Sequence, residues 1–325
     1  ARASVAGKKE GDGPLGKLFD EVVDDPMAGQ NTWEEAESTL QEKVVGHLLN
    51  KAKVKESDVR YIFSGDLLGQ LIASSFGLAK YNIPYFGLFG ACSTIGEGMS
   101  LGSMIVAGGC ADRVIAVTSS HFASAEKQFR FPLEYGNQRP LSATWTVTGS
   151  GGVILEKAVG NNAAFSGKVC IKGVTTGKIV DYGVKDSFNM GASMAPACAD
   201  MIYANFKDFG VDADYYDKIF TGDLGYVGQR ILIDLLKEKG VDISKVHSDC
   251  GMIIFDQETQ DTHAGGSGYG CAAATLCSYI LKRMEEGEFK RVLFAPTGAL
   301  MSTVSYNEGM SIPGIAHGIV LERIE

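Results

Sequence analysis

The sequence predicts an α/β protein built from two similar halves. Short runs of β-branched and apolar residues alternate with helix-length segments along the chain, which is typical of buried strands linked by helices. The 41 glycines against 8 prolines favour many tight turns between strands and helices. Three peptides of the first half also recur, in the same order, in the second half.

The elements of the first half can be placed in order. Residues 1–30 are polar and glycine-rich, and we expect an extended arm or loop there. Thr32 and Glu35 form a capping-box pattern that can satisfy the first free amides of a helix, so a helix should begin there and run to about Lys51. The apolar pattern then predicts strands at 59–64, 84–89, 113–119 and 146–156, helices at 67–80 and 93–108, a long loop at 120–143 and a polar link at 157–164.

The second half repeats this alternation. Its pattern predicts strands at 168–180, 217–221, 252–255, 291–296 and 318–323, and helices at 195–209, 227–239 and 270–286. The recurring peptides are residues 62–67, 113–116 and 152–157, which match residues 219–224, 291–294 and 318–323. Three collinear matches indicate an internal duplication, with an N-terminal half at 1–157 and a C-terminal half at 158–325.

Composition and charge exclude several classes of function. The net charge is −9 and no basic stripe appears, so a nucleic-acid partner is not expected. The longest uncharged stretch of interest, at 98–111, is too short to span a bilayer, and we therefore expect a soluble chain. The 7 cysteines are scattered and form no C-x-x-C pair, so neither a disulfide framework nor a zinc site is predicted. No metal or other cofactor is expected.

The richest local motif surrounds Cys92. A hydrophobic strand should end at Phe89, Gly90 permits a sharp turn, and an uncharged helix should begin just after the cysteine. A thiol at the head of a helix faces unpaired amides and the positive end of the helix dipole, which favour the thiolate. The alternative is a small buried filler, because free cysteines are among the most buried residues. Spacing alone slightly favours the filler, whereas the strand-turn-helix context favours a former or present nucleophile.

A duplicated α/β chain with Ala-Cys-Ser at the head of a glycine-rich helix resembles the thiolase-like condensing enzymes over nearly its whole length. The resemblance implies a five-layered αβαβα fold, a homodimer, and Cys92 at the base of a substrate tunnel. Such enzymes hold the attacking enolate and the thioester oxygen with His–His, His–Asn or Cys–His sets. The three segments where these groups are expected, 220–224, 265–270 and 296–300, contain no histidine, asparagine or second cysteine.

The five histidines of the chain offer few substitutes for the missing groups. His263 is the best candidate base and His121 could reach the pocket, although an anchor of the long loop is its simpler role. His47 should lie on the surface, His247 flanks the glycine-rich segment, and His317 should be structural. We therefore expect no catalysis, with Cys92 as a vestigial nucleophile.

More specific stretches resemble one branch of this superfamily, the stage V sporulation protein AD family of endospore-forming bacteria. The stretches are residues 88–94, 118–121, 126–132, 146–151, 249–251, 294–300 and 311–318. The resemblance implies a protein that binds dipicolinic acid and takes part in its uptake into spores and its release at germination. It further implies a peripheral location at the inner membrane of the forespore, beside the other proteins of the stage V sporulation A channel.

Dipicolinate is a flat ring with two carboxylates, so its site needs apolar walls and several donors. We predict that Cys92, Ser267 and Thr297 line the old tunnel, and that the amides at the head of the helix that begins at Ser93 bind an anion of the ligand. Asp249 could bind a calcium counter-ion or accept from a protonated ligand, although a capping carboxylate is an equal alternative. Three cations of the long loop could add charge, with a surface or dimer role as the alternative for each: Lys127, Arg130 and Arg139.

Two other functions stay open. The chain could be an acyltransferase or condensing enzyme that loads an acyl group on Cys92, with His263 or His121 as the base. It could also be a scaffold whose pocket is a relic and whose function lies in contacts with membrane partners. Covalent loading of Cys92 by a thioester would identify the enzyme, and loss of partner recruitment without loss of ligand binding would identify the scaffold.

Overall fold

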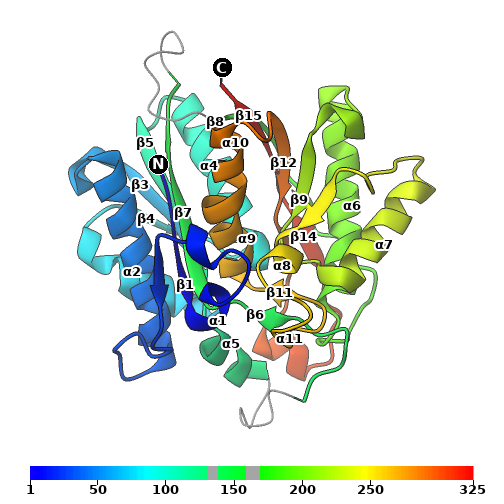
Figure 1. Ribbon diagram of the computed structural model, residues 1–325, viewed down its shortest axis with the longest axis horizontal. Helices are drawn as coiled ribbons and strands as arrows, with labels where there is room; N and C mark the ends of the chain where they lie inside the picture. The colour runs from blue at the N-terminus through cyan, green and yellow to red at the C-terminus, as the bar shows by residue number, and fades with distance from the viewer. Residues whose placement is uncertain (130–137, 159–168, 325) are drawn as a thin grey trace.

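Two mixed β-sheets form the framework of the computed structural model, which describes residues 1–129, 138–158 and 169–324 (Figure 1). The strands of the first sheet are β1 (Arg2–Gly7), β2 (Glu21–Val23), β3 (Tyr61–Gly65), β4 (Tyr85–Gly87), β5 (Arg113–Ser120) and β7 (Gly149–Glu156). Their order in space is β2-β1-β7-β5-β3-β4. β3 pairs parallel with β4 and β5, whereas β7 pairs antiparallel with β5 and β1.

The second sheet repeats this arrangement. Its strands are β8 (Val169–Thr175), β9 (Lys218–Thr221), β10 (His247–Asp249), β12 (Arg291–Ala295) and β15 (Gly318–Arg323). Their order, β10-β9-β12-β15-β8, shows the same succession of parallel and antiparallel pairs as β4-β3-β5-β7-β1. The recurring peptides lie on corresponding strands, so the predicted duplication is confirmed. The boundary between residues 157 and 158 stays a prediction, because residues 159–168 lie outside the described part.

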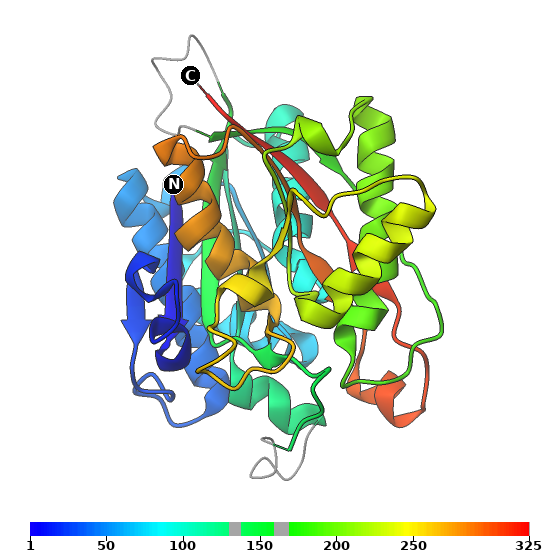
Figure 2. The same cartoon turned by 45° about the vertical axis from the view of Figure 1, so that its right-hand side comes forward.

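Helices cover both sheets and fill the space between them. They are α1 (Lys8–Gly11), α2 (Trp33–Ala52), α3 (Ile72–Leu78), α4 (Thr94–Ala107), α5 (Phe122–Phe129), α6 (Met190–Phe209), α7 (Gly225–Glu238), α8 (Cys250–Ile253), α9 (Tyr269–Thr275), α10 (Leu281–Glu286) and α11 (Thr303–Asn307). α2 and α3 pack outside the first sheet, α6 and α7 outside the second, and α4, α9 and α10 lie between the sheets (Figures 1 and 2). This is the five-layered αβαβα order that was expected.

The central layer is tightly packed because its helices are made of small residues. Every residue of α9 is buried, including a run of three alanines, Ala272–Ala274. α9 rests on β7 at Gly151, where an added Cβ would lie 2.2 Å from the carbonyl oxygen of Ala273. Glycine at this position therefore lets the helix approach the strand backbone, which brings the heads of α4 and α9 together.

The first helix confirms one prediction and the N-terminal segment corrects another. The Glu35 amide donates to Thr32 Oγ1 at 3.2 Å, so α2 begins with the predicted capping box. The prediction of an extended arm or loop at residues 1–30 is wrong, because β1 pairs with β7 inside the first sheet and Val5 is fully buried. β1 is short and is followed by polar residues, so the average composition of residues 1–30 did not indicate a strand.

Three further predictions need correction. The apolar residues 252–255 were expected as a strand, but the strand is β10 and the apolar run begins inside α8, because a short apolar run fits either structure. The expected long loop at 120–143 contains α5. The expected helix at 67–80 starts only at Ile72, since Gln70 and Leu71 have positive φ angles of 57° and 56°.

Two short ladders join the ends of these elements near the site. β6 (Trp145–Thr146) pairs with β11 (Gly266–Ser267), and β13 (Thr297–Ala299) pairs with β14 (Gly314–Ala316). Among the described helices, none has the length and apolar character needed to cross a bilayer. Each of the seven cysteines, all of which lie in the described part, is a free thiol.

Candidate functional site

Cys92 lies in a turn of 3-10 helix between β4 and α4, where the predicted elbow is found. Ala91 adopts a positive φ of 50°, which reverses the chain before the helix. The Ser93 hydroxyl donates to the carbonyl of Gly90 at 2.6 Å, and the Thr94 hydroxyl donates to the carbonyl of Ala91 at 2.7 Å. These bonds fix the turn, and they leave Cys92 8% exposed at the head of α4.

A buried carboxylate from the other half of the chain faces this thiol. Asp223 follows β9 and is fully buried, and its charge acts on the Cys92 thiol. Its Oδ2 accepts from Ser267 Oγ at 2.7 Å and from the Gly268 amide at 3.1 Å, while its Oδ1 accepts from Thr297 Oγ1 at 2.8 Å. Asp223 therefore occupies the segment in which a condensing enzyme would place its first histidine.

This arrangement opposes ionisation of the thiol. Burial is the main cause that raises the pKa of Cys92 well above its usual value, and the negative charge of Asp223 adds to it. Burial likewise raises the pKa of Asp223, although its hydrogen bonds act in the other direction. The helix dipole of α4 favours a thiolate, but desolvation and the neighbouring carboxylate outweigh it, so Cys92 is held as a thiol.

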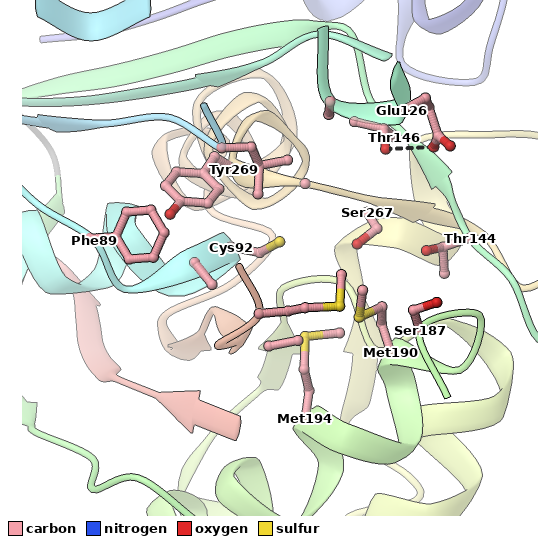
Figure 3. A pocket seen from close by; sticks show the side chains of 16 residues that line it. Phe89, Cys92, Glu126, Thr144, Thr146, Ser187, Met190, Met194, Ser267 and Tyr269 are labelled. Carbon is pink, nitrogen blue, oxygen red and sulfur yellow. Dashed lines mark hydrogen bonds between the residues drawn. The ribbon is translucent and has the colours of Figure 1, made fainter. Parts of the chain in front are cut away.

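Cys92 opens into a pocket between the two halves (Figure 3). The pocket holds about 850 Å³ of empty space, part of which is open to solvent. Its lining consists of Leu67, Phe89, Ala91, Cys92, Ala125, Glu126, Thr144, Thr146, Ser187, Met190, Met194, Ser267, Gly268, Tyr269, Ala299 and Met301. Apolar walls with a few hydroxyl groups are typical of a small-molecule site. Within the described residues, no lysine, arginine or histidine lines it.

The structure brings some of the predicted ligand residues together and separates others. Cys92 and Ser267 line the pocket. Thr297 bonds to Asp223, and Ser93 turns toward Gly90, so neither is part of the lining. These assignments as ligand contacts stay predictions.

Asp249 has the capping role that was the alternative for it. Its Oδ2 accepts from Thr221 Oγ1 at 2.6 Å and from the Leu224 amide at 2.9 Å, and its Oδ1 accepts from the Gly225 amide at 3.1 Å. Asp249 therefore closes the head of α7, outside the pocket lining. Burial is the main cause that raises the pKa of its carboxyl to about 6.

The predicted cations and bases have partners elsewhere. Lys127 pairs with Glu34, and Arg139 donates to the carbonyl of Asp261 at 2.9 Å. Arg130 lies outside the described residues. His263, the best candidate base, bonds to the carbonyl of Pro140 at 2.9 Å and contacts Asp261 at 3.1 Å.

The remaining histidines are also bound away from the pocket. The His121 ring contacts the carbonyl of Pro26 at 2.8 Å, and burial lowers its pKa. Burial lowers the pKa of His247 to about 4, where it contacts Thr221. His47 contacts Glu21, and His317 accepts from the amide of Gly177. None of these five histidines is in the described pocket lining.

Sequence reasoning missed several residues of the site. Asp223 could have been found, because it stands at the position where the family supplies a histidine. No sequence pattern pointed to the opposite wall of the pocket. Thr144 and Ser187 lie in loop segments before β6 and α6. Met190 and Met194 belong to α6, which begins earlier than the helix expected at 195–209. Ser187, Met190 and Met194 are brought to Cys92 only by the packing of the two halves.

The comparisons with known proteins agree with this geometry. The family described as "Stage V sporulation protein AD" matches residues 1–322. A relative from Bacillus subtilis (strain 168) named "Stage V sporulation protein AD" is 44% identical over 320 residues, which cover 98% of this chain and 92% of the relative.

Solved structures of condensing enzymes share the fold at low sequence identity. The 3-oxoacyl-[acyl-carrier-protein] synthase III of Aquifex aeolicus VF5 matches with a TM-score of 0.59 and 12% identity, over 99% of this chain and 98% of that one. AbyA1, a tetronic acid condensing enzyme, matches with a TM-score of 0.58 and 15% identity, over 99% and 98%. The fold is thus that of the thiolase-like enzymes, and the chain itself belongs to the stage V sporulation protein AD family.

Proposed function

We propose that this chain is a non-catalytic thiolase-fold protein that binds dipicolinic acid and takes part in its uptake into spores and its release at germination. Membership of a sporulation family supports the biological setting. The observation that carries the biochemical part is the position of Cys92 beside Asp223, at the head of an apolar pocket with a few hydroxyl groups.

A condensing enzyme needs a thiolate and groups that stabilise the developing oxyanion. Here a carboxylate lies beside the thiol and uses the hydroxyls of Ser267 and Thr297 as its own donors. A carboxylate in that place repels both a thiolate and an oxyanion. The chemistry of the site therefore argues against acyl transfer.

The pocket chemistry also suits a flat ring. Phe89 and Tyr269 lie together at one side, and Met190 and Met194 lie across from them (Figure 3). Aromatic rings and thioethers contact the faces of a planar ligand well. We include calcium as a co-ligand, because a bound cation would offset the charge of a dianion in a pocket whose described lining offers no cationic side chain.

The same proposal includes partners. The chain would lie peripherally at the inner membrane of the spore and contact other proteins of the stage V sporulation A channel. A homodimer is supported by the free edge of the first sheet at β4, where Phe86 is 46% exposed and Phe76 on α3 is 74% exposed. Sedimentation of the wild type and of Phe86→Asp should show a dimer and a monomer, and two monomers would overturn the dimer.

The deciding experiment is calorimetric titration of the purified protein with dipicolinate, with and without calcium, and with an acyl-CoA as comparator. We expect saturable binding of dipicolinate and none of acyl-CoA. Cys92→Ala should weaken the binding of dipicolinate, and an unchanged affinity would place the site elsewhere. Covalent loading of Cys92 by the acyl-CoA, seen as a mass increase, would restore the acyltransferase and overturn the proposal.

A further inference from the structure

The polar groups that line the pocket fall into two classes. The first class is committed to partners inside the protein. The Ser267 hydroxyl donates to Asp223 at 2.7 Å, and the Cys92 thiol lies beside the same carboxylate. The hydroxyl of Thr146 donates to Glu126 at 3.0 Å, a bond drawn in Figure 3. A ligand that accepted hydrogen bonds from these groups would have to break an existing bond for each one gained, which cancels most of the benefit.

The second class consists of hydroxyls without an internal hydrogen bond among the described residues. Tyr269 is one of them, but its oxygen is sealed from solvent. The other two are the hydroxyls of Thr144 and Ser187. Both residues line the pocket, and among the described residues no partner bonds to either hydroxyl. Thr144 is 8% exposed and Ser187 is half-buried, and neither oxygen is sealed from solvent in the way that a buried unpaired group would be. These two donors are therefore available to a ligand without the loss of an internal bond.

The backbone holds both side chains in place. The carbonyl of Ala143 accepts from Ala264 and the amide of Trp145 donates to Gly265, so the chain on both sides of Thr144 is tied to the glycine-rich segment. The Thr144 methyl lies against Gly225, 3.5 Å from the position of an added Cβ. Ser187 lies in a turn closed by Asp186, whose carboxylate accepts from the Phe188 amide at 2.9 Å.

The two hydroxyls lie at the same end of the pocket. In Figure 3, Thr144 and Ser187 lie together on one side, Phe89 and Tyr269 lie on the other, and Cys92 and Ser267 lie between them. They come from different halves, since Thr144 precedes β6 and Ser187 precedes α6. A polar group of the ligand at this end would therefore join the two halves.

We infer that Thr144 and Ser187 form the subsite that recognises a carboxylate of the ligand, each donating one hydrogen bond from its hydroxyl. The inference rests on the proposed function, and it names the residues that donate hydrogen bonds to the ligand. It replaces Ser267 and Thr297 as direct contacts, because those hydroxyls hold Asp223. Recognition by neutral hydroxyls fits a pocket whose described lining carries no cation.

The test is calorimetric titration with dipicolinate of the full chain and of Thr144→Val, Ser187→Ala and the double variant. Each single change removes one hydrogen bond to a charged acceptor, so we expect the affinity to fall about tenfold, and further in the double variant. Thr144→Ser keeps a hydroxyl and should restore binding. Ser103→Ala is the matched control, since this half-buried serine on α4 bonds to the carbonyl of Met99 at 2.6 Å, outside the pocket lining.

Wild-type affinity in both folded single variants would overturn the subsite. Absence of dipicolinate binding in the wild type would instead overturn the proposed function, so the two failures are distinguishable. Thermal melting by circular dichroism checks the fold of each variant. If Thr144→Val does not fold, Ser187→Ala alone decides, because Ser187 is partly exposed and removing its hydroxyl leaves no buried group unpaired.

Discussion

The duplicated halves carry the same corner, Gly-Asp-Leu after a buried strand, and use its aspartate differently. In the first half, Asp66 accepts from the amides of Leu68 and Ser74 at 2.9 and 2.7 Å, so it serves its own loop and helix. In the second half, Asp223 reaches across to Cys92 of the first half. The local sequence is nearly identical, and the difference comes from what packs against each corner.

Each corner also has a second buried carboxyl group beside it. Glu37 on α2 accepts hydrogen bonds from Ser119 and Ser124. Its pKa is raised mainly by burial and further by the charge of Asp66. Asp249 closes α7, and the charge of Asp223 contributes to its raised pKa. A pair of buried acids therefore lies at each corner. Of the four carboxyl groups, Asp223 faces the Cys92 thiol, and the other three bond to nearby loops and helices. The following predictions separate the structural corner from the functional one.

The largest expected effect is on stability, from Asp66→Asn. An asparagine side chain has one acceptor oxygen and an NH2 group that only donates, so it cannot accept from both backbone amides, and one of them would be left buried without a partner. We expect the free energy of unfolding in denaturant to fall by about 3 kcal/mol. Dipicolinate affinity should be unchanged after correction for the folded fraction. Wild-type stability would show that the loop does not depend on this carboxylate.

The next effect is the pH dependence of stability that Glu37 causes. Burial raises its pKa to about 8 in the folded protein, so the fold favours the neutral carboxyl. The unfolded chain loses this proton near pH 4.5, so the stabilisation is complete below that pH and is lost as the pH rises toward 8. Glu37→Gln should remove most of this dependence, measured by denaturant titration from pH 5 to 8.

Asp249→Asn provides the matching case in the second half. Its carboxyl has a raised pKa of about 6, so its contribution to stability should be lost between about pH 4 and pH 6. Glu37→Gln should therefore reduce the pH dependence of stability over a higher pH range than Asp249→Asn does. Two variants that flatten the same range would contradict the assignment of the two acids.

The smallest effect in free energy, but the most specific, is on the reactivity of Cys92. Asp223→Asn removes the charge beside the thiol, so a larger fraction should ionise and alkylation by iodoacetamide should be about tenfold faster at pH 8. In this reaction the thiolate sulfur bonds to carbon, iodide leaves, and the thiol proton goes to the buffer. Mass spectrometry of the Cys92 peptide gives the rate.

The pH dependence of the alkylation rate distinguishes an effect of charge on Cys92 from an effect of a looser fold. The midpoint of this dependence should move to lower pH in Asp223→Asn and stay at the wild-type value in Asp66→Asn. The buried Cys198 and Cys277 should remain unlabelled in both variants, as a control for opening of the fold. An unmoved midpoint in Asp223→Asn would show that desolvation alone holds Cys92 as a thiol.

The fold could largely be predicted from sequence because its strands are short apolar runs and its repeats are collinear. The capping box at Thr32 fixed the start of α2, and the turn before Cys92 was recognised from its glycine and the helix that follows. β1 could not be found, because a buried strand within a polar segment is recognised only by its partner β7. The apolar run at 252–255 was ambiguous, because a short apolar run fits either a strand or a helix.

The sequence by itself determined the duplicated α/β architecture and the position of the thiol, since apolar periodicity and local turn chemistry are encoded over a few residues. Tertiary structure alone decided which side chains surround that thiol. Asp223 comes from the other half, and Ser187 and Thr144 face the pocket only because the two sheets pack on α4 and α9. Contacts between residues more than 50 positions apart depend on packing, and no local pattern records them.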